Sequence, residues 1–293
     1  MNPKTNDIHQ FISLSIFLLT FSLTFGQINP PLASPPARLQ QRIGFTDFTV
    51  DYSRPARRGR AIMGNLVPYG RIWRVGANES TKLTVSDDVT IAGFPVPKGT
   101  YALYAIPQKE EWTIIIHKNT THWGDGRTNY NPQEDLLRFS VKPEVIPYLQ
   151  ENFLIEFDSL DHNSGRMAWL WENTKISFSI QVGTERKMME QINRQIKENP
   201  TADTYYQAAR YLQEEGKMHK EALAWLEKAH QLAGDKYYIH RVWSLVLGQT
   251  GDYSAAIIHA EKSKALAAGE GKDEFVRMNE ASIQEWKKRL DQP

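Results

Sequence analysis

YGRIWRVGANES, residues 69–80, is the stretch around which the first half of the chain is organised. It holds two arginines, a tryptophan, two glycines, an asparagine and a glutamate within twelve residues. An arginine-rich arm, RPARRGR at residues 54–60, precedes it, and segments of alternating hydrophobicity follow it. Because alternation with period two is typical of half-buried β-strands, we expect residues 69–80 to form an ordered polar and aromatic loop on a β scaffold.

The alternating pattern extends on both sides of this loop. It predicts about nine short strands: 48–52, 81–85, 89–96, 101–106, 112–117, 136–141, 152–157, 167–171 and 175–182. The nearly continuous apolar run at 101–106 is typical of a strand buried on both faces. Residues 143–150 are expected to form a single helical turn. Because no long helical pattern separates the strands, the sequence predicts a mainly β, antiparallel sandwich or barrel over residues 38–183.

Several spaced segments of this region resemble a known bacterial family. They are SPPARLQQRIGFTDFTVDYSRP (34–55), LVPYGRIWRVGANESTKLTVSDDVTIAG (66–93), VPKGTYALYAIP (96–107), EWTIIIHK (111–118), HWGDG (122–126) and WLWEN (169–173). The region at about residues 34–182 is similar to the exported proteins grouped as domain of unknown function 2911, familiar from Bacteroidetes-type bacteria. The resemblance implies a secreted or periplasmic β domain and implies no reaction.

The hydrophobic period changes to about 3.6 after residue 183, which predicts an all-α region over residues 184–293. Thr184 and Thr201 are expected to cap the first two helices, and Pro200 to separate them. A glycine turn followed by a helix occurs twice, and Ala222 and Ala256 are 34 residues apart. Residues 201–268 therefore resemble tetratricopeptide repeats, and an amphipathic helix at 273–290 is expected to cover the end of the array.

The composition and the N-terminus restrict the class of protein. The chain has 293 residues, a formal net charge of +1 and no cysteine. These features exclude disulfides and thiolate metal sites and give no support to nucleic-acid binding. Residues 11–25 are almost wholly apolar, so residues 1–26 are expected to be a signal peptide, with an uncleaved anchor as the alternative. Residues 27–37 form a proline-rich lead-in, and no membrane span is expected in the mature chain.

The first candidate site is the loop at 69–80 and its surroundings. Arginine forks bind anions in pairs of hydrogen bonds, and an exposed aromatic ring can stack on a sugar. The alternative is structural, with Trp73 in the core and Arg71 and Arg74 paired with Glu79 or Asp87. The predicted ligand-binding residues are Arg71, Trp73, Arg74, Asn78, Glu79, His122 and Trp123.

Three further groups of residues are candidates. His117, His122 and Asp125 can in principle ligate a divalent metal, but their spacing fits no standard motif, and the sequence predicts neither a metal nor another cofactor. Trp169 and Trp171 share one face of a strand and are expected to lie in the core more often than on a sugar-binding surface. In the helical region, the predicted partner-binding residues are Tyr205, Arg210, Tyr237, His240 and Arg241.

No nucleophile elbow, phosphate loop or zinc-protease helix is present in the sequence. The chain is therefore expected to be a non-catalytic binding protein of the periplasm or cell envelope, whose helices bind a protein and whose β domain binds a small polar or glycan-like ligand. Two alternatives remain open at this point. One is a hydrolase of cell-envelope carbohydrate that uses paired carboxylates, and the other is a purely structural or assembly factor.

Overall fold

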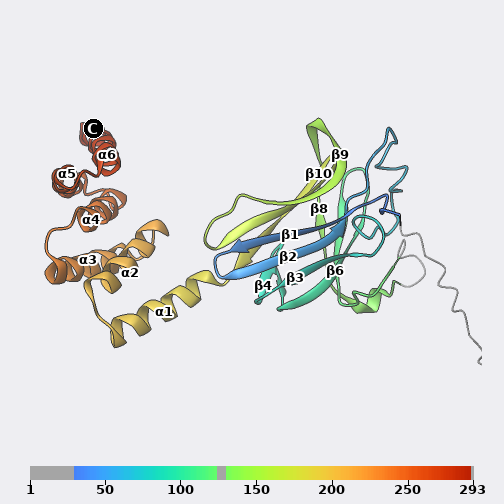
Figure 1. Cartoon of the computed structure of the whole chain (residues 1–293), viewed down its shortest axis with the longest axis horizontal. Helices are drawn as coiled ribbons and strands as arrows, with labels where there is room; N and C mark the ends of the chain where they lie inside the picture. The colour runs from blue at the N-terminus through green and yellow to red at the C-terminus, as the bar shows by residue number, and fades with distance from the viewer. Residues whose placement is uncertain (1–29, 124–129, 292–293) are drawn as a thin grey trace, which may run out of the picture.

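The computed structural model describes residues 30–123 and 130–291 of the chain. Within these residues, ten strands form two antiparallel sheets and six helices follow them (Figure 1). The expected signal peptide, residues 1–26, lies outside the described residues.

The six-stranded sheet has the order β1-β2-β3-β6-β7-β8, and the four-stranded sheet has the order β5-β4-β10-β9. The strands are β1 (Pro36–Ile43), β2 (Thr46–Ser53), β3 (Thr81–Val85), β4 (Val89–Ile91), β5 (Phe94–Val96), β6 (Gly99–Ile106), β7 (Trp112–His117), β8 (Asp135–Val141), β9 (Glu144–Asp158) and β10 (Ser164–Val182). Every neighbouring pair is antiparallel. The expected mainly β, antiparallel fold is confirmed.

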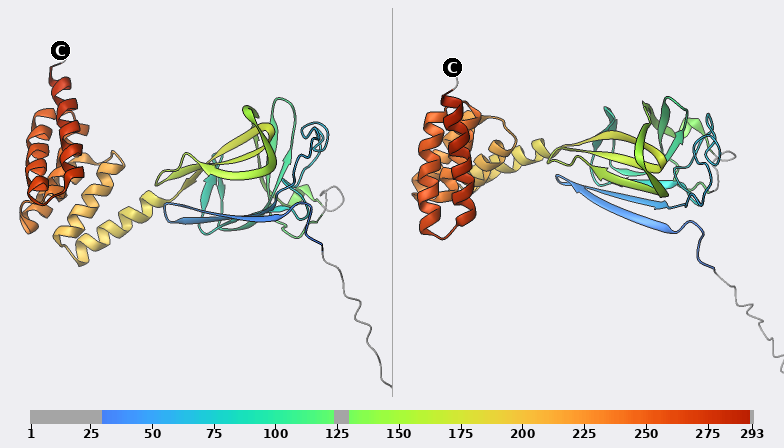
Figure 2. Two further views of the ribbon diagram at one scale, coloured as in Figure 1. Left: turned by 45° about the horizontal axis from the view of Figure 1, so that its top comes forward. Right: turned by 90° about the horizontal axis from the view of Figure 1, so that it is seen from above.

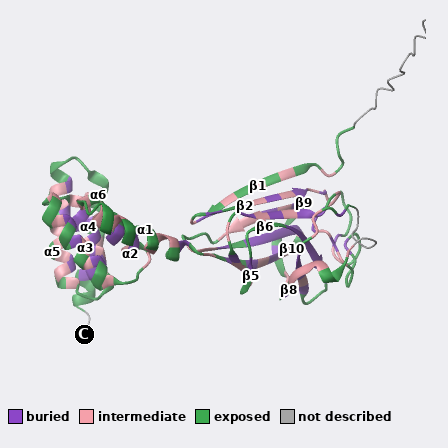
Figure 3. Ribbon diagram, turned by 90° about the horizontal axis from the view of Figure 1, so that it is seen from below, coloured by how far each residue is buried: buried purple, intermediate pink, exposed green. Residues whose placement is uncertain are grey.

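One hydrophobic core fills the space between the two sheets. Alternate residues of the larger sheet, such as Phe48, Leu83 and Ile114, belong to the same buried cluster as Trp169 and Phe178 of the smaller sheet. This arrangement follows from the period of two, which places every second side chain on one face. Buried residues occur in strands of both sheets (Figure 3).

Residues on the outer face of β6 and β7 are also buried, and these form a second, smaller cluster. Ala102, Tyr104 and Ile115 are fully buried there, with Ile72 and Tyr130 packed against them. The loop that carries Ile72 therefore covers the outer face of the larger sheet. The expected burial of residues 101–106 on both faces is confirmed.

The strand expected at 89–96 is a hairpin of two strands, β4 and β5, because the chain turns at Ala92 and Gly93. Three other strand boundaries differ from the expectation. Residues 144–150 are part of the long strand β9 and not a helical turn. The two strands expected at 167–171 and 175–182 are one continuous strand, β10, whose pairing with β9 shifts register around Glu172 at a φ of 57°. Strand β1 is not among the expected strands, and it begins inside the expected lead-in, because its residues pair with β2 along their whole length. Cross-strand pairing, which is not local in sequence, decided all three.

Six helices follow the sandwich. They are α1 (Thr184–Glu198), α2 (Ala202–Glu214), α3 (His219–Ala233), α4 (Tyr237–Gln249), α5 (Tyr253–Gly269) and α6 (Asp273–Leu290). Thr201 caps α2 by accepting a hydrogen bond from the Thr204 amide at 3.2 Å, as expected. Thr184 is not a cap: Gly183 occupies the N-cap position, and Thr184 is the buried first residue of α1.

The helices pack as neighbours along the chain, α2 on α3, α4 on α5 and α5 on α6. Fully buried alanines allow this close approach, among them Ala209, Ala222 and Ala256. In the described residues, no helix is long and apolar enough to cross a membrane. Helix α1 leads from the end of β10 to the other helices (Figure 2). Contacts between Lys187 and Asp87, and between Glu215 and His162, join the two regions.

Candidate functional site

Trp73 is a core residue. Its backbone pairs with Ala105 through hydrogen bonds of 2.7 and 2.9 Å, which fixes the loop to strand β6. Its indole is buried against Trp112, Phe153 and Trp171, and the indole N–H donates to the Gly76 carbonyl at 3.2 Å. The sequence left open whether Trp73 stacks on a ligand or fills the core, and the structure places it in the core.

The two arginines of the loop differ in exposure. Arg71 is exposed and Arg74 half-buried, and together with Trp73 they line a small pocket of about 140 Å³. Neither forms the expected pair with Glu79 or Asp87: Glu79 pairs with Lys82, and Asp87 pairs with Lys187 at 2.7 Å.

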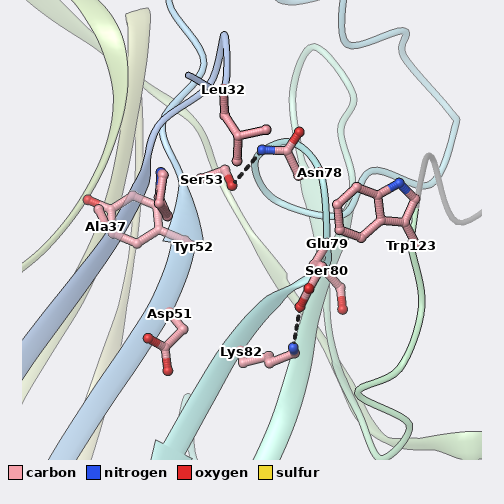
Figure 4. A pocket seen from close by; sticks show the side chains of 11 residues that line it. Leu32, Ala37, Asp51, Tyr52, Ser53, Asn78, Glu79, Ser80, Lys82 and Trp123 are labelled. Atoms are coloured by element: carbon pink, nitrogen blue, oxygen red, sulfur yellow. Dashed lines mark hydrogen bonds and ion pairs between the residues drawn. The ribbon is translucent and has the colours of Figure 1, made fainter. Parts of the chain in front are cut away.

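The end of the loop lines a different pocket, of about 240 Å³ (Figure 4). Asn78 adopts a left-handed conformation with a φ of 62°, and its amide donates to the Ser34 carbonyl at 3.1 Å and to Ser53 Oγ at 3.0 Å. These two bonds use the Asn78 N–H groups to hold the chain segment before β1. We call this pocket the Trp123 groove; it is lined by Leu32, Pro36, Ala37, Asp51, Tyr52, Ser53, Asn78, Glu79, Ser80, Lys82 and Trp123.

Trp123 is the most exposed tryptophan side chain of the described residues, at 61% exposure. It lies on one side of the groove, and Asp51 and Tyr52 lie on the other (Figure 4). An isolated β-bridge between Glu79 and Trp123 fixes the two segments relative to each other. The groove therefore offers an aromatic face next to the Glu79–Lys82 ion pair.

The arginine-rich arm serves the fold. Glu172, at the bulge of β10, lies 3.3 Å from Arg57 Nε and accepts hydrogen bonds from the amides of Ile62 and Met63 at 3.2 and 3.4 Å. Arg54 donates to the Phe153 carbonyl at 3.0 Å. These contacts tie residues 54–63 to the smaller sheet.

A cluster of histidine, tyrosine and carboxylate side chains lies on the outer face of β6 and β7, next to the groove. His117 is fully buried, and its Nδ1 lies 2.9 Å from Asp135 Oδ1. His122 is also buried, with its Nδ1 2.9 Å from the Tyr104 hydroxyl. Glu134 completes the cluster, with Oε2 3.5 Å from His117 Nε2. We call His117, His122 and Glu134 the histidine cluster.

Asp135 is held by two other donors besides His117. Arg138 Nε donates to Asp135 Oδ2 at 2.6 Å, and the Tyr130 hydroxyl donates to the same carboxylate at 2.7 and 2.8 Å. Burial and the Asp135 carboxylate raise the pKa of Tyr130, which keeps its hydroxyl a donor. Burial and the neighbouring His117 lower the pKa of His122, which favours a neutral imidazole.

Sequence reasoning found the two histidines but missed Glu134 and Asp135. The antiparallel register of β7 and β8 pairs His117 with Asp135, eighteen residues further along the chain. A pattern within one segment does not predict the register between two strands. The only local signal is the turn at Pro132–Glu134, which Asn131 and Pro132 indicate in the sequence. Asp125, the acidic residue considered with these histidines, lies outside the described residues.

A protein-family model matches the first part of the chain. The family described as "Protein of unknown function (DUF2911)" matches residues 34–180, which is half of the chain. The chain belongs to this family. Both the Trp123 groove and the histidine cluster lie inside the DUF2911 region, and the six helices follow it. A search of curated proteins found no match.

The predicted partner-binding residues after the DUF2911 region lie in different environments. Tyr205 is half-buried, and Arg210 is exposed and pairs with Glu214 at 2.8 Å. Tyr237 packs its ring on Phe275. His240 and Arg241 are buried, and Arg241 donates to Asn279 Oδ1 at 3.2 Å and Ser282 Oγ at 3.0 Å. The structure does not bring the five residues to one accessible surface, and His240 and Arg241 serve contacts between helices.

Proposed function

We propose that this protein is an exported, non-catalytic binding protein of the cell envelope whose DUF2911 region binds a small polar, glycan-like ligand in the Trp123 groove. The observation that carries the proposal is the exposed indole of Trp123 beside the Glu79–Lys82 pair. Export is supported by the apolar run at residues 11–25 and is tested by finding the mature protein outside the cytoplasm.

The chemistry of the groove suits a sugar. An indole face packs against the C–H surface of a pyranose ring, and polar groups at its edge bind the hydroxyls. Glu79 and Asp51 supply acceptors and Lys82 supplies a donor, all at least partly exposed. The ligand-binding residues that we retain are therefore Asn78, Glu79 and Trp123, with His122 behind them.

The two alternatives from the sequence are less well supported. A glycosidase needs one carboxyl group that is held protonated, but Asp51 and Glu79 each lie against a cation, Arg38 and Lys82. A purely structural role would leave no aromatic platform, whereas Trp123 is exposed.

The proposal is tested by an oligosaccharide array probed with the wild-type protein and two variants. Trp123→Ala should lower binding at least about tenfold, because the stacking face is lost. The matched control is Tyr148→Ala, since Tyr148 is also exposed but lies on β9 of the other sheet. Equal loss in both variants, or no binding by the wild type, would show that the groove is not a glycan site.

A second proposed function concerns the helices. We propose that α1 to α5 form a tetratricopeptide-like array that binds an extended peptide of a protein partner. The support is the 34-residue spacing of the buried Ala222 and Ala256, each in the second helix of a pair, and a groove of about 320 Å³ between α1 and α2. The groove is lined largely by amide and hydroxyl side chains, including Gln191, Gln195, Asn199, Thr204 and Gln207. Such side chains bind the main chain of an extended peptide.

A displayed peptide library, selected on the full-length protein, tests this second function. The double variant Gln191→Ala/Gln207→Ala should lose the selected peptides, while Arg210→Ala, outside the groove lining, tests the contribution of a residue predicted from the sequence alone. If selected peptides bind the double variant as well as they bind the wild type, the α1–α2 groove is not their site.

A further inference from the structure

Three ligand-type side chains converge on the outer face of the larger sheet. One ring nitrogen of His117, one of His122 and one carboxylate oxygen of Glu134 all lie within 4.8 Å of one another. They come from the end of β7, from the loop after it, and from the turn before β8. The rings of the two histidines are 5.4 Å apart, and both contact Tyr104.

The hydrogen bonds of His117 fix which of its nitrogens carries a proton. Asp135 lies against the Arg138 guanidinium and is therefore an ionised acceptor. His117 Nδ1, at 2.9 Å from this carboxylate, must then be the donor. In the neutral ring this leaves a lone pair on Nε2, which is buried and has no hydrogen-bond partner among the described residues.

Another acceptor lies close to this nitrogen. Glu134 Oε2 lies 3.5 Å from His117 Nε2. No hydrogen bond of suitable geometry joins these two atoms. A cation between the two acceptors would stabilise them at this separation. The separation is what two ligands of one tetrahedral Zn²⁺ would show, since metal–ligand lengths of about 2.0–2.2 Å place neighbouring ligand atoms about 3.3–3.5 Å apart.

His122 has the matching outer partner. If it ligates through Nε2, its Nδ1–H donates to the Tyr104 oxygen 2.9 Å away. An outer partner on each histidine, Asp135 for His117 and Tyr104 for His122, is the arrangement that orients metal-ligating imidazoles.

We propose that His117, His122 and Glu134 bind one divalent first-row transition metal ion, of which Zn²⁺ is the type case. Two imidazoles and one carboxylate suit Zn²⁺ and its neighbours better than Mg²⁺ or Ca²⁺. Three protein ligands leave a coordination position for water or a ligand atom, as in catalytic zinc sites. This goes beyond the sugar-binding proposal, which requires no metal.

A second group of similar composition provides an internal control. His230, Asp235 and His240 also lie within 4.8 Å of one another at their ligand atoms. There, however, the Lys262 ammonium is 2.7 Å from Asp235 Oδ1 and already supplies the cation. We therefore expect this group to bind no metal.

The test is calorimetric titration of ZnCl₂ into full-length, tag-free protein that has been treated with EDTA. We expect one equivalent of Zn²⁺ bound. Glu134→Gln removes a ligand that is partly exposed and should weaken binding at least about tenfold without unfolding the sandwich. His122→Gln should weaken it more. Co²⁺ substitution should give the intense visible absorption of a four-coordinate ion, and Glu134→Gln should change that spectrum.

The controls are His230→Gln and Trp123→Ala, which should both bind Zn²⁺ as the wild type does. Absence of Zn²⁺, Co²⁺ and Ni²⁺ binding by the folded wild type would overturn the metal site. The proposal would also be overturned if His230→Gln lost Zn²⁺ binding while Glu134→Gln retained it. Trp123→Ala is expected to lose sugar binding and to keep Zn²⁺ binding, so the two proposals can fail independently of each other.

Discussion

His117 and Asp135 are register partners in the β7–β8 pair, and their side chains meet at 2.9 Å between Nδ1 and Oδ1. The His117 side chain is fully buried, and the Asp135 side chain, which also pairs with Arg138, is almost fully buried. Metal sites and catalytic bases both use a carboxylate to fix the tautomer of a buried imidazole. Here the other ring nitrogen, Nε2, lies 3.5 Å from Glu134 Oε2.

The variant Asp135→Asn tests Asp135 as a positioning residue. It replaces an ionised acceptor that receives bonds from His117, Tyr130 and Arg138, so we expect a loss of about 2–3 kcal/mol in the free energy of unfolding. With the protein still folded, Zn²⁺ affinity should fall roughly 10- to 100-fold. Urea unfolding and calorimetry measure the two effects. Asp51→Asn, which removes an exposed pair with Arg38, should cost less than about 1 kcal/mol and leave Zn²⁺ binding unchanged.

Two tryptophans of the same region should respond oppositely to truncation. Trp73→Ala empties a site between Trp112, Phe153 and Trp171 and should destabilise the protein by about 3–5 kcal/mol. Trp123→Ala removes an exposed ring and should change stability by no more than about 0.5 kcal/mol. Chemical denaturation followed by circular dichroism gives both values, and similar losses in the two variants would contradict these positions.

The helical region should lose stability as the pH falls below 6.5. Burial, with His240, Lys262 and His230 nearby, lowers the pKa of His259 to about 4. The unfolded chain then binds a proton near pH 6.5 that the folded chain binds only near pH 4, so stability is fully present above 6.5 and declines through that window. Lys262 and two histidines also hold the pKa of Asp235 well below its usual range, which adds to the loss at lower pH.

The expected loss from His259 is about 1–3 kcal/mol between pH 7 and pH 4. The variant His259→Gln lacks this titration, so its unfolding free energy should depend less steeply on pH than that of the wild type. The variant also loses the stacking of His259 on Trp243, which lowers stability equally at each pH. Denaturation at several pH values measures the difference, and parallel curves would refute the assignment.

Gly248 and Gly269 offer a matched test of helix packing. A Cβ on Gly248 of α4 would lie 2.7 Å from the Trp286 ring of α6, so Gly248→Ala should destabilise the protein by about 1–2 kcal/mol despite its better helix propensity. A Cβ on Gly269, at the end of α5, meets no atom within 4 Å, so Gly269→Ala should leave the melting temperature unchanged or slightly higher. A melting temperature that rises in both variants would show that the Trp286 side chain moves aside at little cost in free energy.

Local patterns predicted most of the elements but not their limits. Strands β2, β3, β6 and β7 and helix α6 follow from hydrophobic periods within single segments, so their positions agree with the structure. Residues 144–150 have no strong alternation and become strand because β10 pairs with them. The sequence left open whether Trp73 is buried or exposed, because a tryptophan in a loop belongs to no hydrophobic period that would distinguish a core position from a surface position.

Local patterns are enough to assign the class of each region, since alternation and the 3.6-residue period are local consequences of backbone geometry. They also carry the family resemblance and single out His117, His122, Glu79 and Trp123. Which of these residues meet depends on how the strands pair. The register of β7 with β8 joins His117 to Asp135, and the turn before β8 adds Glu134. Such contacts depend on strand pairing between distant segments, and a pattern within one segment does not contain that information.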